Sequence, residues 1–314
     1  MELIQDIDIV KNISKKDFSE YYDKPQKPVI IKGLAEGTRA GQAWSLDYFS
    51  KRLGDIIVGV YDNDNKKARG SAYTKPDLQM PFKQYLDLLA EGNHSNLRIF
   101  LFNMFKYDPR LREEFPCPSL CSGLLDRMGY MFFGARNTQV RIHYDIDMSS
   151  VLHTHFGGRK RVVLMAPGYS DLLYKLPLNT YSLIDFDRPD YNKYPALRYL
   201  RYYDFVLEPG DSVFMPAGYW HYMTYLDNSF SVSYRKIAPG LRTRAQGLAN
   251  LGLYMPLDKL LNKAAGYRWL ALKEWMAGRR ADKAVHLIYG KYVEQVLKTA
   301  GMQVASESKN IFGA

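Results

Sequence analysis

The sequence predicts a mainly β protein with helices. Residues 130–234 contain short apolar strands separated by Gly and Pro turns, a texture typical of β-barrels and β-sandwiches. After Pro239 the texture changes to apolar residues at helical spacing among many Lys and Arg residues. Residues 1–240 are therefore expected to form the core domain with an N-terminal extension, and residues 241–314 a helical region.

Local signals predict the elements that precede the barrel. Residues 1–35 suggest a short helical start, followed by a β-rich run that ends at Gly33. Ser45 is a suitable first residue for a helix that stops at Gly54. The remaining predictions are a strand over residues 55–61, a polar loop from Asp62, a helix over residues 80–91 and a buried strand over residues 96–105.

Gly and Pro punctuate the predicted barrel. Gly157 and Gly158 are expected to interrupt a hairpin whose second strand covers residues 160–165. Residues 208–211 and 216–218 are predicted to be turns between further strands. The C-terminal helical segments are expected over residues 255–265, 267–278 and 281–300, with a frayed tail from about residue 306.

Composition limits the class of protein. A chain of 314 residues with 46% apolar residues can bury a substantial core. The formal charge of +10 is consistent with an acidic binding partner, such as nucleic acid, an acidic peptide or an anionic co-substrate. It is equally consistent with a basic surface that only keeps the protein soluble. Cys117 and Cys121, the only cysteines, are too few for a zinc site or a disulfide framework. Without a signal peptide or an apolar membrane span, a soluble cytoplasmic protein is expected.

The segment from Arg141 to Asp147 carries the main chemical signal. Alternate residues of a strand share a face, so His143 and Asp145 are expected to project to the same side. A His-x-Asp triplet alone is weak, but His221 follows a Gly-Asp turn, a strand and a Pro-Gly turn that bring it to a strand start. Two His and one carboxylate form the facial triad that holds iron(II) and leaves coordination positions open.

Other candidate ligands are weighed lower. His153 and His155 alternate on the strand before Gly157, and are predicted to shape the cavity or pack in the barrel, with a ligand role less favoured. Asp147 is expected to lie beyond ligand reach and to contact substrate. His94, in a polar loop, and His286, on a helix, are expected to have no role in the site.

Together, these motifs resemble the JmjC-type, cupin-like hydroxylases. The resemblance is carried by the His-x-Asp triplet, the Gly-Gly-Arg-Lys-Arg run from Gly157 and the segment from Glu208 to His221. It covers residues 139–234 closely, and residues 28–33 and 44–54 loosely. It implies a double-stranded β-helix, or jelly roll, as the catalytic domain, with iron(II), 2-oxoglutarate and O2 at the site.

The resemblance also implies a co-substrate site. Lys160 stands at the family's lysine position and is expected to bind the distal carboxylate of 2-oxoglutarate; a solvated lysine is the weaker alternative. Where better-known members often carry Asn, this chain has Ser150 and Ser233. The remaining departures are Val140 in place of Thr and Phe100 in place of Tyr, for which Asn103, Arg141 or Tyr130 are expected to compensate.

The implied reaction is hydroxylation of a C–H bond coupled to conversion of 2-oxoglutarate to succinate and CO2. A peptide or protein side chain is the expected substrate; the alternatives are tRNA or another RNA, lysine demethylation, and a non-catalytic binding protein. Trp269, Leu272 and Met276, with Trp275 beside them, form an apolar stripe that is expected to join two copies, or to pack on its own barrel. The basic residues around it are Lys259, Lys263, Arg268, Lys273, Arg279, Arg280 and Lys283.

Overall fold

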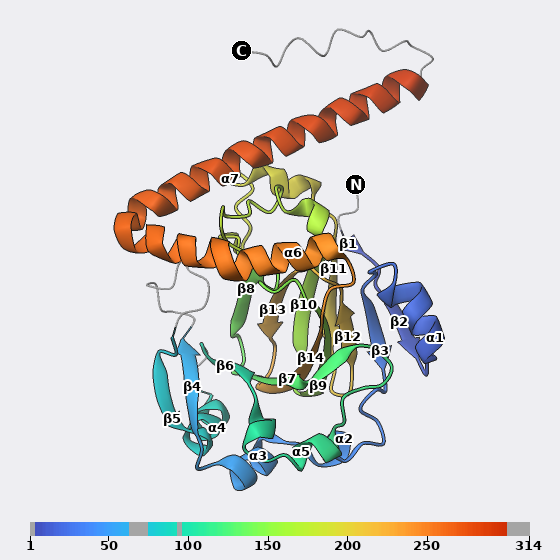
Figure 1. Cartoon of the computed structure of the whole chain (residues 1–314), viewed down its shortest axis with the longest axis vertical. Helices are drawn as coiled ribbons and strands as arrows, with labels where there is room; N and C mark the ends of the chain where they lie inside the picture. The colour runs from blue at the N-terminus through green and yellow to red at the C-terminus, as the bar shows by residue number, and fades with distance from the viewer. Residues whose placement is uncertain (1–3, 63–74, 93–95, 300–314) are drawn as a thin grey trace.

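Two β-sheets form the centre of the protein (Figure 1). The structure is a computed structural model that describes residues 4–62, 75–92 and 96–299. Within these residues one sheet has five strands in the order β1-β11-β10-β13-β8, and the other has nine in the order β2-β3-β12-β9-β14-β7-β6-β4-β5. The mainly β fold class expected from the sequence is confirmed.

Eight consecutive strands form the jelly-roll core. Strands β7, β9, β12 and β14 lie in the larger sheet, and β8, β10, β11 and β13 lie in the smaller one. The chain changes sheet at every connection except that between β10 and β11, and the pairs are antiparallel. The strands are β7 (Leu124–Gly134), β8 (Gln139–His143), β9 (Ser150–Gly157), β10 (Lys160–Met165), β11 (Tyr202–Leu207), β12 (Ser212–Met215), β13 (Trp220–Tyr225) and β14 (Ser229–Lys236).

Apolar side chains from both sheets fill part of the space between them. Val162 and Leu164 of β10 pack with Val213 of β12 and Val151 of β9, and these side chains are almost completely buried. Alternation along each strand turns one set of residues inward, so burial of this set stabilises the pairing of the two sheets.

The expected hairpin at Gly157 and Gly158 is wrong. Strand β9 pairs with β12 and β14, whereas β10 pairs with β11 and β13, so this turn crosses from one sheet to the other. Gly158 has a φ of +69°, and a Cβ there would lie 2.6 Å from the carbonyl oxygen of Asn228. Local sequence marks such a turn but does not encode which sheet receives the next strand. The turns predicted at residues 208–211 and 216–218 join β11 to β12 and β12 to β13 as expected.

From Ile4, the first described residue, the chain forms strands and not the expected helix. Strands β1 (Ile4–Gln5) and β2 (Asp8–Lys11) precede α1 (Lys15–Phe18), the π-helical turn η1 (Ser19–Asp23) and β3 (Val29–Lys32). β2 lies parallel to β3, which in turn pairs with β12, so long-range pairing overrides the weak local signal. The short α2 (Arg39–Ala43) follows, and then α3 (Leu46–Leu53) begins after Ser45, whose hydroxyl caps the amide of Tyr48, and ends at Gly54 as predicted.

A second group of elements extends the larger sheet. It consists of β4 (Ile57–Asp62), β5 (Leu78–Pro81), α4 (Phe82–Glu91), β6 (Leu97–Phe102), the 3-10 turn η3 (Met104–Lys106) and α5 (Leu111–Glu114). The predicted helix starts two residues late because residues 80 and 81 pair with β4, and the predicted strand over residues 96–105 ends at Phe102. Asp62, where the predicted loop was expected to start, is the last residue of β4. Residues 63–74, which follow it, lie outside the described residues.

The C-terminal region is helical, as expected. It consists of α6 (Leu241–Ala249), the π-helical turn η6 (Asn250–Tyr254) and α7 (Met255–Thr299). α7 bends sharply at Gly266 (φ 47°, ψ −120°), a backbone conformation that glycine reaches most easily. In Figure 1 the first arm crosses one end of the β-core, and the second arm runs back and projects beyond it. The break expected near residues 279–280 is absent, since the second arm is one continuous helix.

The body-facing side of α7 differs from the predicted apolar stripe. Lys273 is 0% exposed, and its Nζ donates to Asp258 Oδ1 at 2.8 Å, so it does not belong to a solvated basic face. Trp269 Nε1 donates to the same carboxylate oxygen at 2.8 Å. The rest of the predicted stripe is exposed: Leu272 (46%), Trp275 (63%) and Met276 (38%). None of the described helices combines the length and hydropathy of a membrane span.

Candidate functional site

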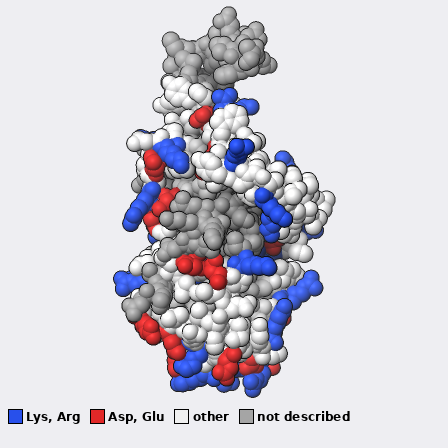
Figure 2. Space-filling view, turned by 90° about the vertical axis from the view of Figure 1, so that its left-hand side faces the viewer, with Lys and Arg blue, Asp and Glu red and all other residues white. Residues whose placement is uncertain are grey.

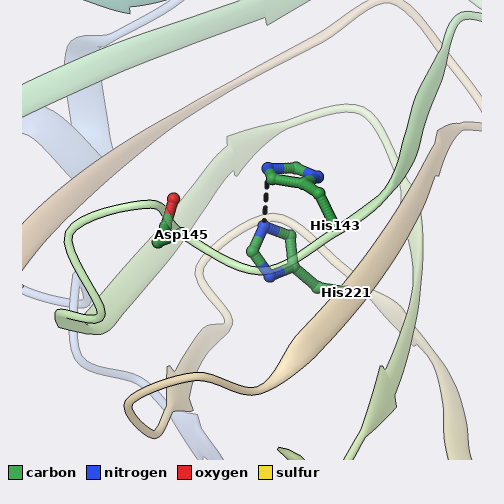
Figure 3. A group of neighbouring side chains, drawn as sticks. All are labelled: His143, Asp145 and His221. Carbon is green, nitrogen blue, oxygen red and sulfur yellow. Dashed lines mark hydrogen bonds between the residues drawn. The ribbon is translucent and has the colours of Figure 1, made fainter. Parts of the chain in front are cut away.

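His143 and His221 face each other across two neighbouring strands. β8 and β13 are antiparallel, and their register makes these two residues direct partners. The ring centroids are 4.2 Å apart, and the two Nε2 atoms lie 3.1 Å apart (Figure 3). The structure thus brings together two residues that are 78 positions apart in the sequence.

Asp145 joins the two imidazoles from a turn and not from the strand. β8 ends at His143, and the amide of Met148 donates to the Asp145 carbonyl at 2.9 Å to close the turn. One carboxylate oxygen and one nitrogen from each imidazole all lie within 4.8 Å of one another (Figure 3). The predicted triad therefore meets in space, although the expected shared strand is wrong for Asp145.

Hydrogen bonds fix which nitrogen of each ring is free. Nδ1 of His143 lies 2.7 Å from the carbonyl oxygen of Arg141, and Nδ1 of His221 lies 3.2 Å from that of Tyr219. Because a carbonyl only accepts, both Nδ1 atoms carry the proton and both Nε2 lone pairs face inward. Burial lowers the pKa of His143 to about 3 and also lowers that of His221, so both rings are neutral at pH 7.

This donor set fits a divalent metal ion. Two facing lone pairs repel one another unless a cation lies between them and Asp145. Ligand atoms about 2.1 Å from a metal, at right angles to each other, are about 3 Å apart, which agrees with the 3.1 Å between the two Nε2 atoms. Two imidazoles and one carboxylate are the ligands of the iron(II) facial triad.

Arg235 holds the carboxylate in place. Its guanidinium donates to Asp145 Oδ1 at 2.9 Å and to Asp147 Oδ1 at 2.9 Å. Burial acts to raise the pKa of Asp145, but Arg235 and the two imidazoles lower it to about 2, so the carboxylate is ionised. Asp147 also accepts from Ser149 and does not line the cavity, so its expected substrate contact is not supported.

Tyr181 packs against His143. The two rings are stacked with centroids 5.2 Å apart, and a β-bridge joins the backbones of the two residues. The neighbouring Asn179 donates to Asp258 at 3.0 Å, which links this loop to α7. Sequence reasoning missed Tyr181, because its segment has no regular periodicity that could give its orientation.

The three ligands open into a cavity between the two sheets. Its empty space, counted together with the opening to solvent, is about 740 Å³. The wall includes Lys160, Arg141 and Ser233, three of the residues predicted to bind a co-substrate, as well as Val140 and Phe100. Other wall residues are Arg98, Leu101, Phe132, Val151, His153, Tyr181, Met215, Met223, Tyr225 and Arg235.

Lys160 is a buried cation without a carboxylate partner. Its side chain is completely buried, and no acidic group of the described residues forms an ion pair with it. Nζ instead contacts Ser231 Oγ at 2.6 Å and His153 Nε2 at 3.3 Å, and lies 4.3 Å from the centroid of Tyr225. Burial lowers the pKa of Lys160 to about 7. A buried ammonium that lacks a counter-ion favours an anionic ligand.

His153 and His155 orient Lys160 and do not join the metal ligands. His155 Nε2 donates to the Gly158 carbonyl at 2.9 Å, so its Nδ1 accepts from Ser231, 2.8 Å away. The Ser231 oxygen is then free to accept from Lys160. His153 accepts from Lys160 through Nε2 and donates through Nδ1 to Ser233 at 2.7 Å. His153 lines the cavity, whereas His155 is packed behind it, in agreement with the prediction that these rings shape the cavity or pack in the barrel.

Two predicted co-substrate residues lie elsewhere. Ser150 is buried at the start of β9, where its hydroxyl faces Gln26 Oε1 at 3.4 Å, and it does not line the cavity. Asn103 follows β6 and donates to the Arg127 carbonyl at 3.2 Å. Tyr130 also lies outside the cavity wall. β6 ends one residue before Asn103, so the expected long strand placed this side chain wrongly.

The two cysteines and His286 lie outside the cavity wall. Cys117 and Cys121 are free thiols, and burial raises their pKa to about 11 and about 12. His286 is exposed on α7, and His94 lies outside the described residues. Ser231 and Arg235 were not predicted as site residues, although the sequence could have indicated them. They alternate with Ser233 along β14 and therefore share its face of the strand.

Comparison with known families identifies the fold. The sequence profile of the cupin-like domain matches residues 15–235, which is most of the chain. The chain belongs to the cupin-like domain family. The match includes all three metal-ligand candidates and Lys160, in agreement with the resemblance to JmjC-type proteins.

Individual relatives have different names. The chain is 26% identical over 232 residues to "Lysine-specific demethylase 8" of Xenopus tropicalis, covering 70% of this chain and 50% of that protein. It is 26% identical over 231 residues to "tRNA wybutosine-synthesizing protein 5" of Mus musculus, covering 68% of this chain and 71% of that one. The chain thus spans about half the length of the demethylase it matches.

Removal of a ligand should abolish tight metal binding. Loss of a group that only orients a metal ligand costs about 10–100-fold in affinity, so His143→Ala should weaken iron(II) or manganese(II) binding by more than about 100-fold. Anaerobic titration calorimetry measures this. His286→Ala, at an exposed histidine of α7, should bind like the wild type. Equal affinity of His143→Ala and wild type would refute the site.

Proposed function

We propose that this protein is an iron(II)- and 2-oxoglutarate-dependent oxygenase that hydroxylates a side chain of a peptide or protein. The observation that supports this most strongly is the group of His143, Asp145 and His221, within 4.8 Å of one another on one side of a cavity. Because the described residues offer three ligands at this point, the other positions of an octahedral ion remain for co-substrate and oxygen.

Each residue of the site has a role. The bound iron would supply redox chemistry that couples conversion of 2-oxoglutarate and O2 into succinate and CO2 to insertion of one oxygen atom into a substrate C–H bond. His143 and His221 present neutral Nε2 atoms to the ion, because the carbonyls of Arg141 and Tyr219 hold their Nδ1 protons. Arg235 fixes the Asp145 carboxylate, and aromatic walls limit the access of water.

Lys160 fits the distal carboxylate of 2-oxoglutarate. It is fully buried in the cavity wall, and its uncharged acceptors leave its positive charge uncompensated. A carboxylate at this place gains a charge-assisted hydrogen bond in a low-dielectric site. Ser233 and Arg141 line the same cavity and are proposed as further polar contacts to the co-substrate.

A polypeptide fits the surface better than RNA does. On the face shown in Figure 2, outside the grey atoms, Lys and Arg side chains are interspersed with Asp and Glu and form no continuous basic stripe. Binding along an RNA backbone depends on neutralising successive phosphates with clustered cations. The relatives named for tRNA wybutosine synthesis keep RNA as the second candidate substrate.

A second copy of the chain fits the exposed face of α7. The second arm projects beyond the β-core, and it exposes Trp275 (63%), Leu272 (46%) and Tyr289 (62%). Large exposed apolar side chains along one helix are typical of a surface that another protein covers. We therefore propose a homodimer through the C-terminal helices, as the sequence predicts.

Mass spectrometry tests the reaction and the substrate class together. With iron(II), 2-oxoglutarate and O2, the protein should form succinate, and a peptide in a treated proteome should gain one oxygen atom. The Asp145→Ala variant should give neither product, since the ion loses the one carboxylate ligand that the described residues offer. Nucleosides of tRNA treated in parallel provide the comparison, and oxygen incorporation there but not in peptides would favour the RNA alternative.

Lys160→Met should weaken 2-oxoglutarate binding by at least about 30-fold, because loss of one partner of a buried charge pair costs about 2–5 kcal/mol. In wild type the pKa of about 7 means that the neutral lysine must take up a proton to bind a carboxylate above this pH. Affinity should therefore fall as the pH rises from about 7 to about 9, and this dependence should vanish in Lys160→Met.

Calorimetry on the manganese-loaded protein measures both effects. The matched control is Arg159→Met, because Arg159 is next to Lys160 in the chain but is exposed and pairs with Asp227 at 2.8 Å. Undiminished 2-oxoglutarate affinity in Lys160→Met would exclude the proposed carboxylate contact.

Trp275→Glu should convert the dimer into a monomer, because it places a charge in the proposed apolar interface. Sedimentation velocity measures the mass in solution. Lys283→Glu, at an exposed polar position of the same helix, should leave the dimer intact. A wild-type protein that is monomeric at micromolar concentration would contradict the proposal.

A further inference from the structure

Arg98 lies on the cavity wall at the edge formed by β6. Leu97 and Ile99 point into the apolar core, whereas Arg98 and Phe100 face the cavity, as expected for alternate residues of a strand. The pairing of β6 with β7 shifts between Ile99 and Phe102, and Leu101 has a φ of +54°. Such bulges are common beside active sites, where they redirect side chains.

The Arg98 guanidinium has no polar partner among the described residues. Its Nε atom is buried without a hydrogen bond, and no described acidic residue pairs with it. Its guanidinium carbon lies 4.8 Å from the centroid of Phe100, within the range of a cation–π contact. Burial raises the pKa of the wall residues Tyr181 and Tyr225, whereas the positive charge of Arg98 lowers the pKa of both. The guanidinium therefore lies near these two hydroxyl groups.

The charges of the cavity wall are unbalanced. Its cationic side chains are Arg98, Arg141, Lys160 and Arg235, and its single acidic side chain among the described residues is Asp145. Arg235 is already paired with Asp145 and Asp147. In the proposed function the co-substrate's distal carboxylate is bound by Lys160 and its other carboxylate is directed to the metal. Arg98 then remains a cation without an anion, and a buried unsatisfied donor calls for a ligand.

We propose that Arg98 binds a carboxylate of the polypeptide substrate, so that an acidic side chain lies at or next to the modified residue. This inference rests on the proposed function of the same site. A guanidinium supported by an aromatic ring presents its planar edge for a bidentate bond to a carboxylate, and a lysine lacks this fork. Arg98 is thus assigned as the residue that determines specificity.

A protein carboxylate fits better than an RNA phosphate. The cavity offers one unpaired arginine inside a wall with Phe100, Phe132 and Tyr181, which suits a single side chain that enters between rings. Successive phosphates would need a run of cations across the surface, and Figure 2 shows charges of both signs interspersed on the face it displays.

Binding of fixed-centre peptide pools tests this inference. The probes are fluorescent randomised heptapeptides with Asp, Glu, Asn, Gln, Lys or phosphoserine at the centre, and the protein is loaded with manganese(II) and 2-oxoglutarate. Wild type should bind an Asp or Glu pool at least about tenfold more tightly than the Asn or Gln pool, a modest value for a charge-assisted contact. Arg98→Met should lose this preference, and Arg98→Glu should prefer the Lys pool.

The control is Arg127→Met, at an exposed arginine of β7 outside the cavity, which should keep the wild-type preference. Thermal melting checks that each variant is folded, and the reversed preference of Arg98→Glu cannot arise from unfolding. Equal binding of acidic and amide pools by wild type, or preference for phosphoserine, overturns the inference while leaving the oxygenase intact. Absence of succinate formation by wild type with iron(II) overturns the proposed function and the inference together.

Discussion

The pairing register of β8 and β13 is the constraint on which the site depends. It sets His143 directly opposite His221, with Nε2 atoms 3.1 Å apart. A slip of one residue would turn one imidazole to the other face of the sheet and separate the pair. The alternating connections of the jelly roll stabilise this register, since each of these two strands is fixed by the strands before and after it in the facing sheet.

Charge organises the interior around these two strands. The Asp145 carboxylate is kept ionised by Arg235, and the two neutral imidazoles lie beside it. Elsewhere in the cavity wall, Lys160 donates to two neutral acceptors, Ser231 Oγ and His153 Nε2. Both acceptors direct their own protons to other partners, so a lone pair faces the ammonium. The cavity therefore attracts anions and a metal cation at different places. This distribution is what the proposed binding of a metal ion and a dicarboxylate co-substrate requires.

The C-terminal helix contributes to the site from outside. Asp258 accepts from Lys273 and from Trp269, and its second oxygen accepts from Asn179 in the loop that carries Tyr181. Tyr181 in turn stacks on His143. Breaking a buried ion pair of this type by removing one partner costs about 3–5 kcal/mol, because the remaining charge is left without compensation. The helix thus orders the residue that packs against a candidate metal ligand, and it also exposes an apolar face.

The sequence by itself determined the chemistry of the ligands and much of the architecture. Turn residues and two-residue alternation predicted the barrel strands, the helix after Ser45 and the helical C-terminus, and the spacing of His143, Asp145 and His221 with Lys160 indicated the candidate site. These are local properties, since periodicity, turn preference and donor type are all visible within a few residues.

Only the tertiary structure decided which distant groups meet. It placed Ser150 and Asn103 outside the cavity, moved Asp145 from the strand to a turn, and buried Lys273 against Asp258. It also revealed Arg235, Tyr181 and the unpaired Arg98. The physical reason is that the register of strand pairs and the choice of sheet depend on the summed packing of the whole core, and no short segment encodes that sum.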